Sequence, residues 1–166
     1  MEKLTSIEYA HILQYIAYKK YGTVLSKTQV LKLLFMIYGL YLAQTDTLLF
    51  DDDTPKVWPF GPVFPRVYNS FDSSKSYNVP NSSIAQKYNN SENTIARKIV
   101  QIIVREYHNY SATALSEWSH QDNGPWRRTI DKNGDNFKWN DEIPKELIKD
   151  YFQEFAGKLN LQDKAS

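Results

Sequence analysis

The sequence contains no cysteine among its 166 residues. Disulfide bonds and cysteine-ligated zinc sites are therefore excluded, and a reducing compartment is compatible with this composition. Long apolar runs are missing too, because the longest uncharged one, residues 33–43, is far shorter than the roughly 20 residues that span a bilayer. Residues 1–6 lack the basic and apolar regions of a secretory signal. We therefore expect a cytoplasmic protein with no membrane contact.

An excess of one charge sign is also absent. The 20 basic and 19 acidic residues give a formal net charge of +1. Nucleic-acid binding usually needs a clustered excess of Lys and Arg, so a nucleic-acid partner is not indicated. Aromatic content is high at 14%, with 12 tyrosines. Because tyrosine serves both cores and protein-contact surfaces, the composition favours a protein partner, and a homo-oligomer stays open.

Motifs that carry chemistry are scarce. The histidines, His11, His108 and His120, form no metal-binding pair, and the six scattered glycines form neither a phosphate-binding loop nor a nucleophile elbow. The acidic run 51–53 lacks the alternating ligand spacing of a calcium loop, so we interpret it as a solvated turn. We expect no metal, no cofactor and no enzymatic activity.

Two capping boxes, at residues 5–8 and 26–29, predict helices over residues 5–20 and 27–43. The second helix is apolar nearly all round, which is typical of a helix in the middle of a domain. Gly39 inside it predicts the close approach of another backbone, since glycine weakens a helix interior by about 1 kcal/mol relative to alanine.

The remaining elements follow from periodicity and from Gly and Pro positions. Helices are predicted over residues 65–71, 94–110, 111–120 and 144–157, and short strands at 48–50 and 137–139. Gly124 and Pro125 should stop a helix, and the Ser- and Asn-rich residues 72–93 should form an irregular excursion or weak hairpin. The predicted fold is mainly α (α+β). It is a compact single domain (residues 1–166) of about five helices around the central apolar helix 27–43, with minor short strands and a frayed tail at 159–166.

Residues 58–68 read Trp-Pro-Phe-Gly-Pro-Val-Phe-Pro-Arg-Val-Tyr and combine stiffness with large rings. Four of the chain's seven prolines lie between residues 55 and 65, which excludes a regular helix or central strand from most of this segment. The rings either pack inward or form a shaped contact surface. Buried Trp58 and Tyr68 would indicate a scaffold, whereas exposed Phe60 or Phe64 would indicate a contact surface.

A second constellation runs from Leu115 to Arg127 and joins a helix end to two indoles, an imidazole and a guanidinium. His120 could act as a general base oriented by Glu117 or Asp122. Alternatively it caps the C-terminal end of its helix. We favour the cap, because no nucleophile or oxyanion-type glycine turn accompanies the histidine.

Taken together, these segments resemble the Panacea-domain proteins, also known as SocA-like or GepA-like phage-associated proteins. The resemblance covers nearly the whole chain and rests on three blocks: Lys32-Leu33-Leu34-Phe35 through Gly39, Trp58-Pro59-Phe60-Gly61-Pro62-Val63 with Pro65 and Tyr68, and Leu115-Ser116 with His120 and Pro125-Trp126. Phe35 and Phe60 stand where the family usually has tyrosine, and Ser119 where it has threonine. These departures keep the ring or the hydroxyl.

The resemblance implies the antitoxin of a two-gene toxin–antitoxin system, often in a phage or mobile-element setting. It implies neutralisation of a cognate toxin mostly by direct binding, while some relatives act as protease adaptors. Rigid aromatics and arginine are good interface anchors. The candidate partner-binding or motif residues are Trp58, Phe60, Gly61, Pro62, Val63, Phe64, Pro65, Arg66, Tyr68, Ser116, His120, Pro125, Trp126 and Arg127.

Two alternatives stay open. The motif residues could hold the fold, which would leave residues 72–93 to select the toxin. The two successive helices 5–20 and 27–43 could also form a DNA-binding helix-turn-helix, although the second would then have to read DNA with an almost wholly apolar surface.

Overall fold

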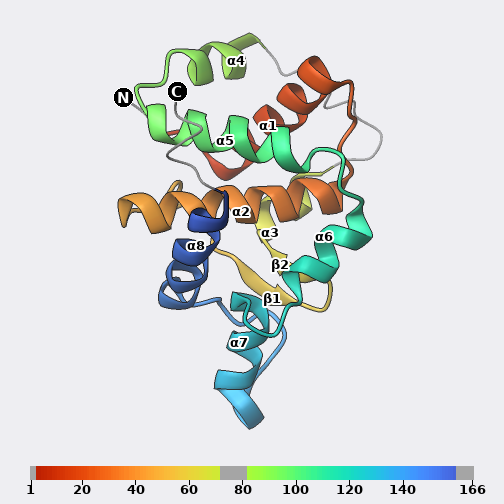
Figure 1. Cartoon of the computed structure of the whole chain (residues 1–166), viewed down its shortest axis with the longest axis vertical. Coiled ribbons are helices and arrows are strands. Elements are labelled where there is room, and N and C mark those ends of the chain that lie inside the picture. The colour runs from red at the N-terminus through yellow and green to blue at the C-terminus, as the bar shows by residue number, and fades with distance from the viewer. Residues whose placement is uncertain (1–2, 72–81, 160–166) are drawn as a thin grey trace.

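The computed structural model describes residues 3–71 and 82–159. Its elements run in the order α1 (Ser6–Tyr21), α2 (Lys27–Thr45), β1 (Lys56–Trp58), β2 (Gly61–Val63), α3 (Pro65–Ser70), α4 (Ser82–Asn89), α5 (Thr94–Tyr107), α6 (Ala112–Ser119), α7 (Pro125–Asn133), a short 3-10 turn η1 (Gly134–Asn136) and α8 (Lys145–Leu159). Figure 1 shows α2 across the middle of the molecule, with the small hairpin beside it. The mainly α prediction is confirmed. The single domain over residues 1–166 stays a prediction.

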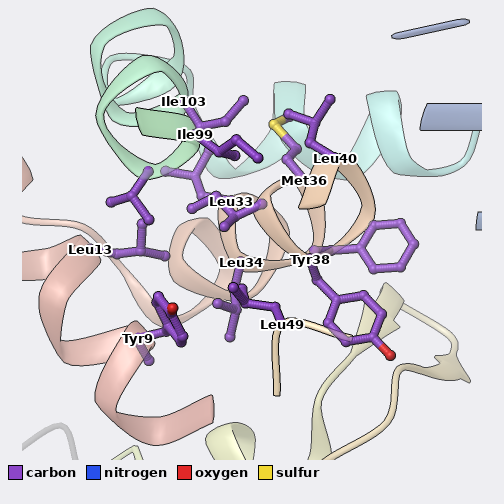
Figure 2. Packing of buried hydrophobic residues seen from close by; sticks show 14 of the residues in the cluster. Tyr9, Leu13, Leu33, Leu34, Met36, Tyr38, Leu40, Leu49, Ile99 and Ile103 are labelled. Atoms are coloured by element: carbon purple, nitrogen blue, oxygen red, sulfur yellow. The ribbon is translucent and has the colours of Figure 1, made fainter. Parts of the chain in front are cut away.

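Helix α2 is the centre of the fold, as its apolar sequence predicts. Every residue from Val30 to Leu40 is buried. Helices α1 and α5 lie on one side of α2, and α8, α6 and the hairpin lie on the other (Figure 1). Helix α3 contacts both α1 and α2. Figure 2 shows side chains of α1 and α5 converging on those of α2. Because α2 is enclosed along most of its length, it does not have the exposed face that a DNA-reading helix needs.

The two predicted capping boxes are present. Thr5 Oγ1 accepts a hydrogen bond from the Glu8 N–H, and Glu8 Oε1 accepts one from the Thr5 N–H, at 3.2 and 2.9 Å. Ser26 and Gln29 form the same reciprocal pair at the start of α2. Each box satisfies backbone donors that the first turn of a helix leaves free, so the helix starts are set by local sequence.

A side chain, and not another backbone, approaches Gly39 closely, so the predicted close approach of a second backbone is wrong. A Cβ atom at this position would lie 2.1 Å from Cδ2 of Phe152, on the fully buried ring that α8 packs against α2. The ring occupies the space that any side chain at residue 39 would need.

The strands predicted at residues 48–50 and 137–139 are wrong, because the sheet forms inside the proline-rich segment. Strands β1 and β2 pair antiparallel, with Trp58 opposite Gly61 and Val57 opposite Pro62. The Val57 N–H and C=O point away from β2 and bond to Asp141 O and Asn140 N at 2.8 and 2.7 Å. The Val57 carbonyl therefore needs no hydrogen bond from residue 62. A proline, which has no backbone N–H, is tolerated at that position of the strand.

Three helix predictions also need correction. The described residues contain eight α-helices instead of about five, including α4 within the segment expected to be irregular. Pro125 begins α7 where a stop was expected, because proline suits the first turn of a helix. Helix α8 continues past Gly157 to a buried Leu159, whereas the rest of the predicted frayed tail lies outside the described residues. In the described part of the chain, no helix is long and apolar enough to cross a membrane.

Candidate functional site

The two motif blocks that the sequence singles out meet at the hairpin. The indole N–H of Trp126, at the start of α7, donates to the carbonyl oxygen of Trp58 at 2.8 Å. The His120 ring, at the end of α6, stacks on the Trp126 indole with centroids 4.1 Å apart. The Trp58 indole in turn donates to Asn140 Oδ1 at 2.9 Å. Residues more than 60 positions apart thus hold one face of the hairpin.

A buried lysine holds the hairpin from beneath. Lys32 of α2 is only 1% exposed, and its Nζ donates to the Pro62 carbonyl at 3.1 Å. None of the described carboxylates pairs with it. Burial lowers the pKa of the Lys32 amine to about 8, because the charged form is poorly solvated there. The sequence pattern marks Lys32 only as part of the Lys-Leu-Leu-Phe block, although a lysine inside an apolar helix is itself a signal of a special role.

Gly61 fits tightly against the same lysine. Its φ of +112° lies in a region that side-chain-bearing residues rarely adopt, and an added Cβ would lie 2.6 Å from Ser119 Oγ and 2.9 Å from Lys32 Nζ. The Ser119 hydroxyl donates to the Ser116 carbonyl at 2.8 Å. Glycine is therefore required at residue 61 both for backbone conformation and for space.

His120 occupies the C-cap position of α6, as expected, but its main chain does the capping. The backbone N–H bonds to the Ser116 and Glu117 carbonyls. The pKa of the ring is lowered by burial and by the nearby charges of Lys32 and Arg127, while a backbone hydrogen bond at Phe60 opposes the shift. Among the described residues Nε2 has no hydrogen-bond partner, and the exposed Glu117 and Asp122 do not orient the ring. This geometry does not provide an oriented general base.

The acidic run after α2 is not a solvated turn, which corrects the sequence interpretation. Asp53 is buried, and its Oδ2 accepts from the backbone N–H groups of Arg66 and Val67 at 2.9 and 3.4 Å. Asp52 accepts from the backbone N–H and hydroxyl of Ser6. Two of the three carboxylates therefore cap the N-termini of α3 and α1. Burial raises the pKa of Asp53, and its backbone hydrogen bonds counteract that effect.

The candidate residues divide into a buried and an accessible group. The buried members are Gly61, Pro62, Val63, Phe64, Pro125 and Trp126. The half-buried members are Trp58, Pro65, Tyr68, Ser116, His120 and Arg127, and the exposed members are Phe60 and Arg66. Phe64 packs in the core against Phe35, Tyr38 and Phe50. Trp58 and Tyr68 pack edge to face at 5.0 Å. Most of the motif is therefore buried or half-buried against other parts of the fold.

The hairpin tip nevertheless presents a large apolar side chain to solvent. Phe60 is 67% exposed, and Trp139, which sequence analysis did not include among the candidates, is 54% exposed. The Trp139 ring lies 6.4 Å from that of Trp126, over which the Arg127 guanidinium sits at 5.1 Å. We define Phe60, Arg127 and Trp139 as the hairpin surface. Trp139 was missed because residues 137–139 read as an ordinary strand.

Other concave regions lie away from these residues. A cavity of about 410 Å³ opens between α1, the end of α2 and the start of α5, and its walls include Tyr9, Tyr41, Lys87 and Asn93. None of the candidate residues lines it. Within residues 3–71 and 82–159, no group of three or more His, Cys, Asp or Glu side chains is placed to hold a metal ion.

Comparison with known proteins agrees with this layout. The family model described as Antitoxin SocA-like, Panacea domain matches residues 30–127, a span that holds most of α2, the hairpin and the start of α7. Neither a curated protein nor a solved structure matches the chain. The match covers more than half of the sequence and agrees with the motif-based resemblance. The chain therefore belongs to the family of SocA-like antitoxins with a Panacea domain.

Proposed function

We propose that this protein neutralises a cognate toxin by binding it directly through the hairpin surface. Family membership assigns an antitoxin role, and hence a toxin partner in general. The observation that supports direct binding is the exposure of Phe60 and Trp139. The Trp139 ring lies near that of Trp126, over which the Arg127 guanidinium sits. Aromatic and arginine side chains are enriched among the residues that dominate binding energy at protein interfaces.

The hydrogen bonds that hold the hairpin in place support a role in partner recognition. Lys32, Trp126 and Asn140 fix the hairpin through three separate hydrogen bonds. A surface that is already ordered loses little conformational entropy when a partner binds, so more of the contact energy appears as affinity. The exposed ring of Phe60 therefore sits on a rigid base that suits a binding anchor.

The same contacts favour binding over catalysis. The Ser119 hydroxyl donates to a main-chain carbonyl of its own helix, and the Lys32 amine donates to Pro62. The two polar groups that lie against Gly61 therefore have structural partners. We propose that the protein is not an enzyme and that neutralisation needs no chemical step.

Co-expression with the product of the adjacent reading frame tests this function. We expect the neighbouring protein to arrest growth alone, and this protein to restore growth and to co-purify with it. A neighbouring product that is harmless alone, or that stays toxic and unbound, would contradict the proposal. Restored growth with loss of the toxin and no stable complex would instead indicate a protease adaptor.

Substitutions on the hairpin surface test the site. Phe60→Ser and Trp139→Ser should each weaken toxin binding by about 30-fold, the effect of losing about 2 kcal/mol from an aromatic anchor. Ile95→Ser is the matched control, because Ile95 is an exposed apolar side chain on α5. Equal affinities for all three variants and the unmodified protein would show that the toxin binds elsewhere.

A further inference from the structure

A second group of exposed apolar side chains lies at the C-terminal end of α1 and in the connections α1–α2 and α5–α6. Among the described residues, seven large hydrophobic side chains are exposed, and four of them are Tyr18, Tyr21, Val24 and Tyr110. Phe60 and Trp139 belong to the hairpin surface, and Ile95 stands apart. We define Tyr18, Tyr21, Val24 and Tyr110 as the tyrosine surface. Exposed apolar groups that gather in this way mark contact sites more often than scattered ones do.

The tyrosine surface is held in place by contacts between two connections, α1–α2 and α5–α6. Tyr21 stacks on His108 with ring centroids 4.1 Å apart. His108 Nδ1 and Thr23 Oγ1 share a hydrogen bond of 2.8 Å. The Gln29 side-chain amide donates to the Tyr110 carbonyl at 2.8 Å. These contacts join the two connections and hold the Tyr21 ring and the main chain of Tyr110 in place, so this part of the surface is ordered before any partner arrives.

The charge around the tyrosine surface is mostly positive. Lys19, Lys20 and Lys27 flank it, and residues 15–30 contain no Asp or Glu. On the other side, residues 104–115 contain one acid, Glu106, which pairs with Arg105 at 3.2 Å. The net charge of the whole chain is only +1, so this end is distinctly more positive than the rest. An acidic partner complements it.

We propose that the tyrosine surface binds an acidic segment of the toxin, as a contact separate from the hairpin surface. This inference rests on the proposed function. The start of α2 links the two regions, because Lys27 lies over the Tyr68 ring at 3.3 Å and Tyr68 packs on Trp58 of the hairpin. We expect one partner to contact both surfaces. Tyrosine and valine beside only three lysines suit a protein better than nucleic acid, which needs more cations.

Charge substitutions test the electrostatic part of the proposal. The toxin from the adjacent reading frame is titrated against the full chain at low and at high salt. Lys19→Glu with Lys20→Glu should weaken binding at least about tenfold at low salt, and the loss should shrink at high salt because ions screen exposed charges. Lys145→Glu with Lys158→Glu, at exposed positions of α8, is the matched control and should bind as the unmodified protein does. Lys19→Gln with Lys20→Gln removes the charges without placing carboxylates at the end of α1.

Apolar substitutions test the contact itself. Tyr18→Ser with Val24→Ser should weaken toxin binding at least about tenfold at both salt concentrations, whereas Ile95→Ser should not. Val24 is 62% exposed, so its replacement leaves the core intact. Circular dichroism and the melting temperature verify that each variant is folded.

The outcomes separate this inference from the proposed function. If Phe60→Ser weakens binding but no change at the tyrosine surface does, the inference is wrong and direct neutralisation stands. If the unmodified protein neither binds the toxin nor neutralises it, both are wrong. If Lys19→Glu with Lys20→Glu abolishes salt-dependent binding to a duplex DNA fragment but leaves toxin affinity unchanged, the surface takes nucleic acid and the inference is wrong.

Discussion

At the scale of single residues, Lys32 makes a hydrogen bond that an aliphatic side chain at the same position could not make. Its amine reaches the Pro62 carbonyl from inside the central helix, and so links the core to the hairpin. A buried amine is costly when charged, and its pKa of about 8 expresses that cost. The hairpin is therefore attached by a polar contact that stability measurements can detect through pH.

The stability of the fold should rise with pH between 7 and 9.5 because of Lys32. Its pKa is about 8 in the folded state and ordinarily 10.5, so over this range the unfolded chain binds more protons than the folded chain. Lys32 should add about 2 kcal/mol to the unfolding free energy at pH 9.5 relative to pH 7. Urea unfolding at several pH values measures this rise, and Lys32→Met should remove it.

The control for this experiment is Lys158→Met, at an exposed position of α8. It should keep the slope of the unmodified protein. The range stops at pH 9.5 because burial raises the pKa of Tyr38, Tyr88 and Tyr107 to about 12. Those phenols make the folded state lose stability once unfolded tyrosines ionise near pH 10. The same slope in Lys32→Met and the unmodified protein would contradict the assignment.

At the scale of single residues, a sequence motif can mark a residue without predicting whether its side chain is buried or exposed. The motif identified Phe64 and Phe60 equally, yet one is in the core and the other is at the tip of the hairpin. Asp53 looked like part of a solvated acidic run, and it caps a helix that begins 12 residues later. Both outcomes depend on which distant segment lies opposite the residue, and no local pattern contains that information.

At the scale of elements, helix starts were predictable and the hairpin was not. The capping boxes at Thr5 and Ser26 are local signals, because donors and acceptors lie three residues apart. The hairpin depends on nonlocal partners, since Val57 bonds to residues 140 and 141 and Pro62 accepts from Lys32. Helix α7 was missed because a Gly-Pro pair can end one helix and begin the next.

The packing of α8 on α2 gives a prediction for a pair of residues. Gly39→Ala should destabilise the protein by about 1–3 kcal/mol, because the new methyl group overlaps the Phe152 ring. In a Phe152→Ala background the same change should stabilise the protein by up to about 1 kcal/mol, since alanine favours a helix. A double-mutant cycle from urea unfolding measures this reversal of sign. An equal effect of Gly39→Ala in both backgrounds would show that the ring does not determine the glycine.

At the scale of the whole molecule, α2 is the common partner of most other elements. It contacts α1, α3, α5, α6, α8 and β2, whereas the main contact of α4 is with α1, and those of α7 are with α8, β1 and η1 (Figure 1). The sequence predicted this centre because an all-apolar helix must be enclosed. It did not predict how the peripheral helices are arranged, since each of them has one apolar face that fits several neighbours.

This arrangement predicts a hierarchy of hydrogen exchange. Backbone amides in the middle of α2 should exchange only through global unfolding, because several elements must leave before water reaches them. Amides of α4 and α7 should exchange orders of magnitude faster through local opening. Native-state exchange followed by mass spectrometry or NMR measures both. Protection of α7 equal to that of α2 would contradict a fold organised around the central helix.

The hairpin is attached through main-chain atoms, so the residues at its turn can differ without loss of the hydrogen bonds that hold it. Lys32 and Trp126 donate to the carbonyl oxygens of Pro62 and Trp58, atoms that every amino acid possesses. Pro59 and Phe60 form the turn between the strands, and neither contributes its side chain to these two bonds. Substitution of the turn residues therefore changes the side chains that the tip presents to a partner, while both hydrogen bonds remain. The same scaffold can acquire a new specificity by changes at the tip, with little cost to folding.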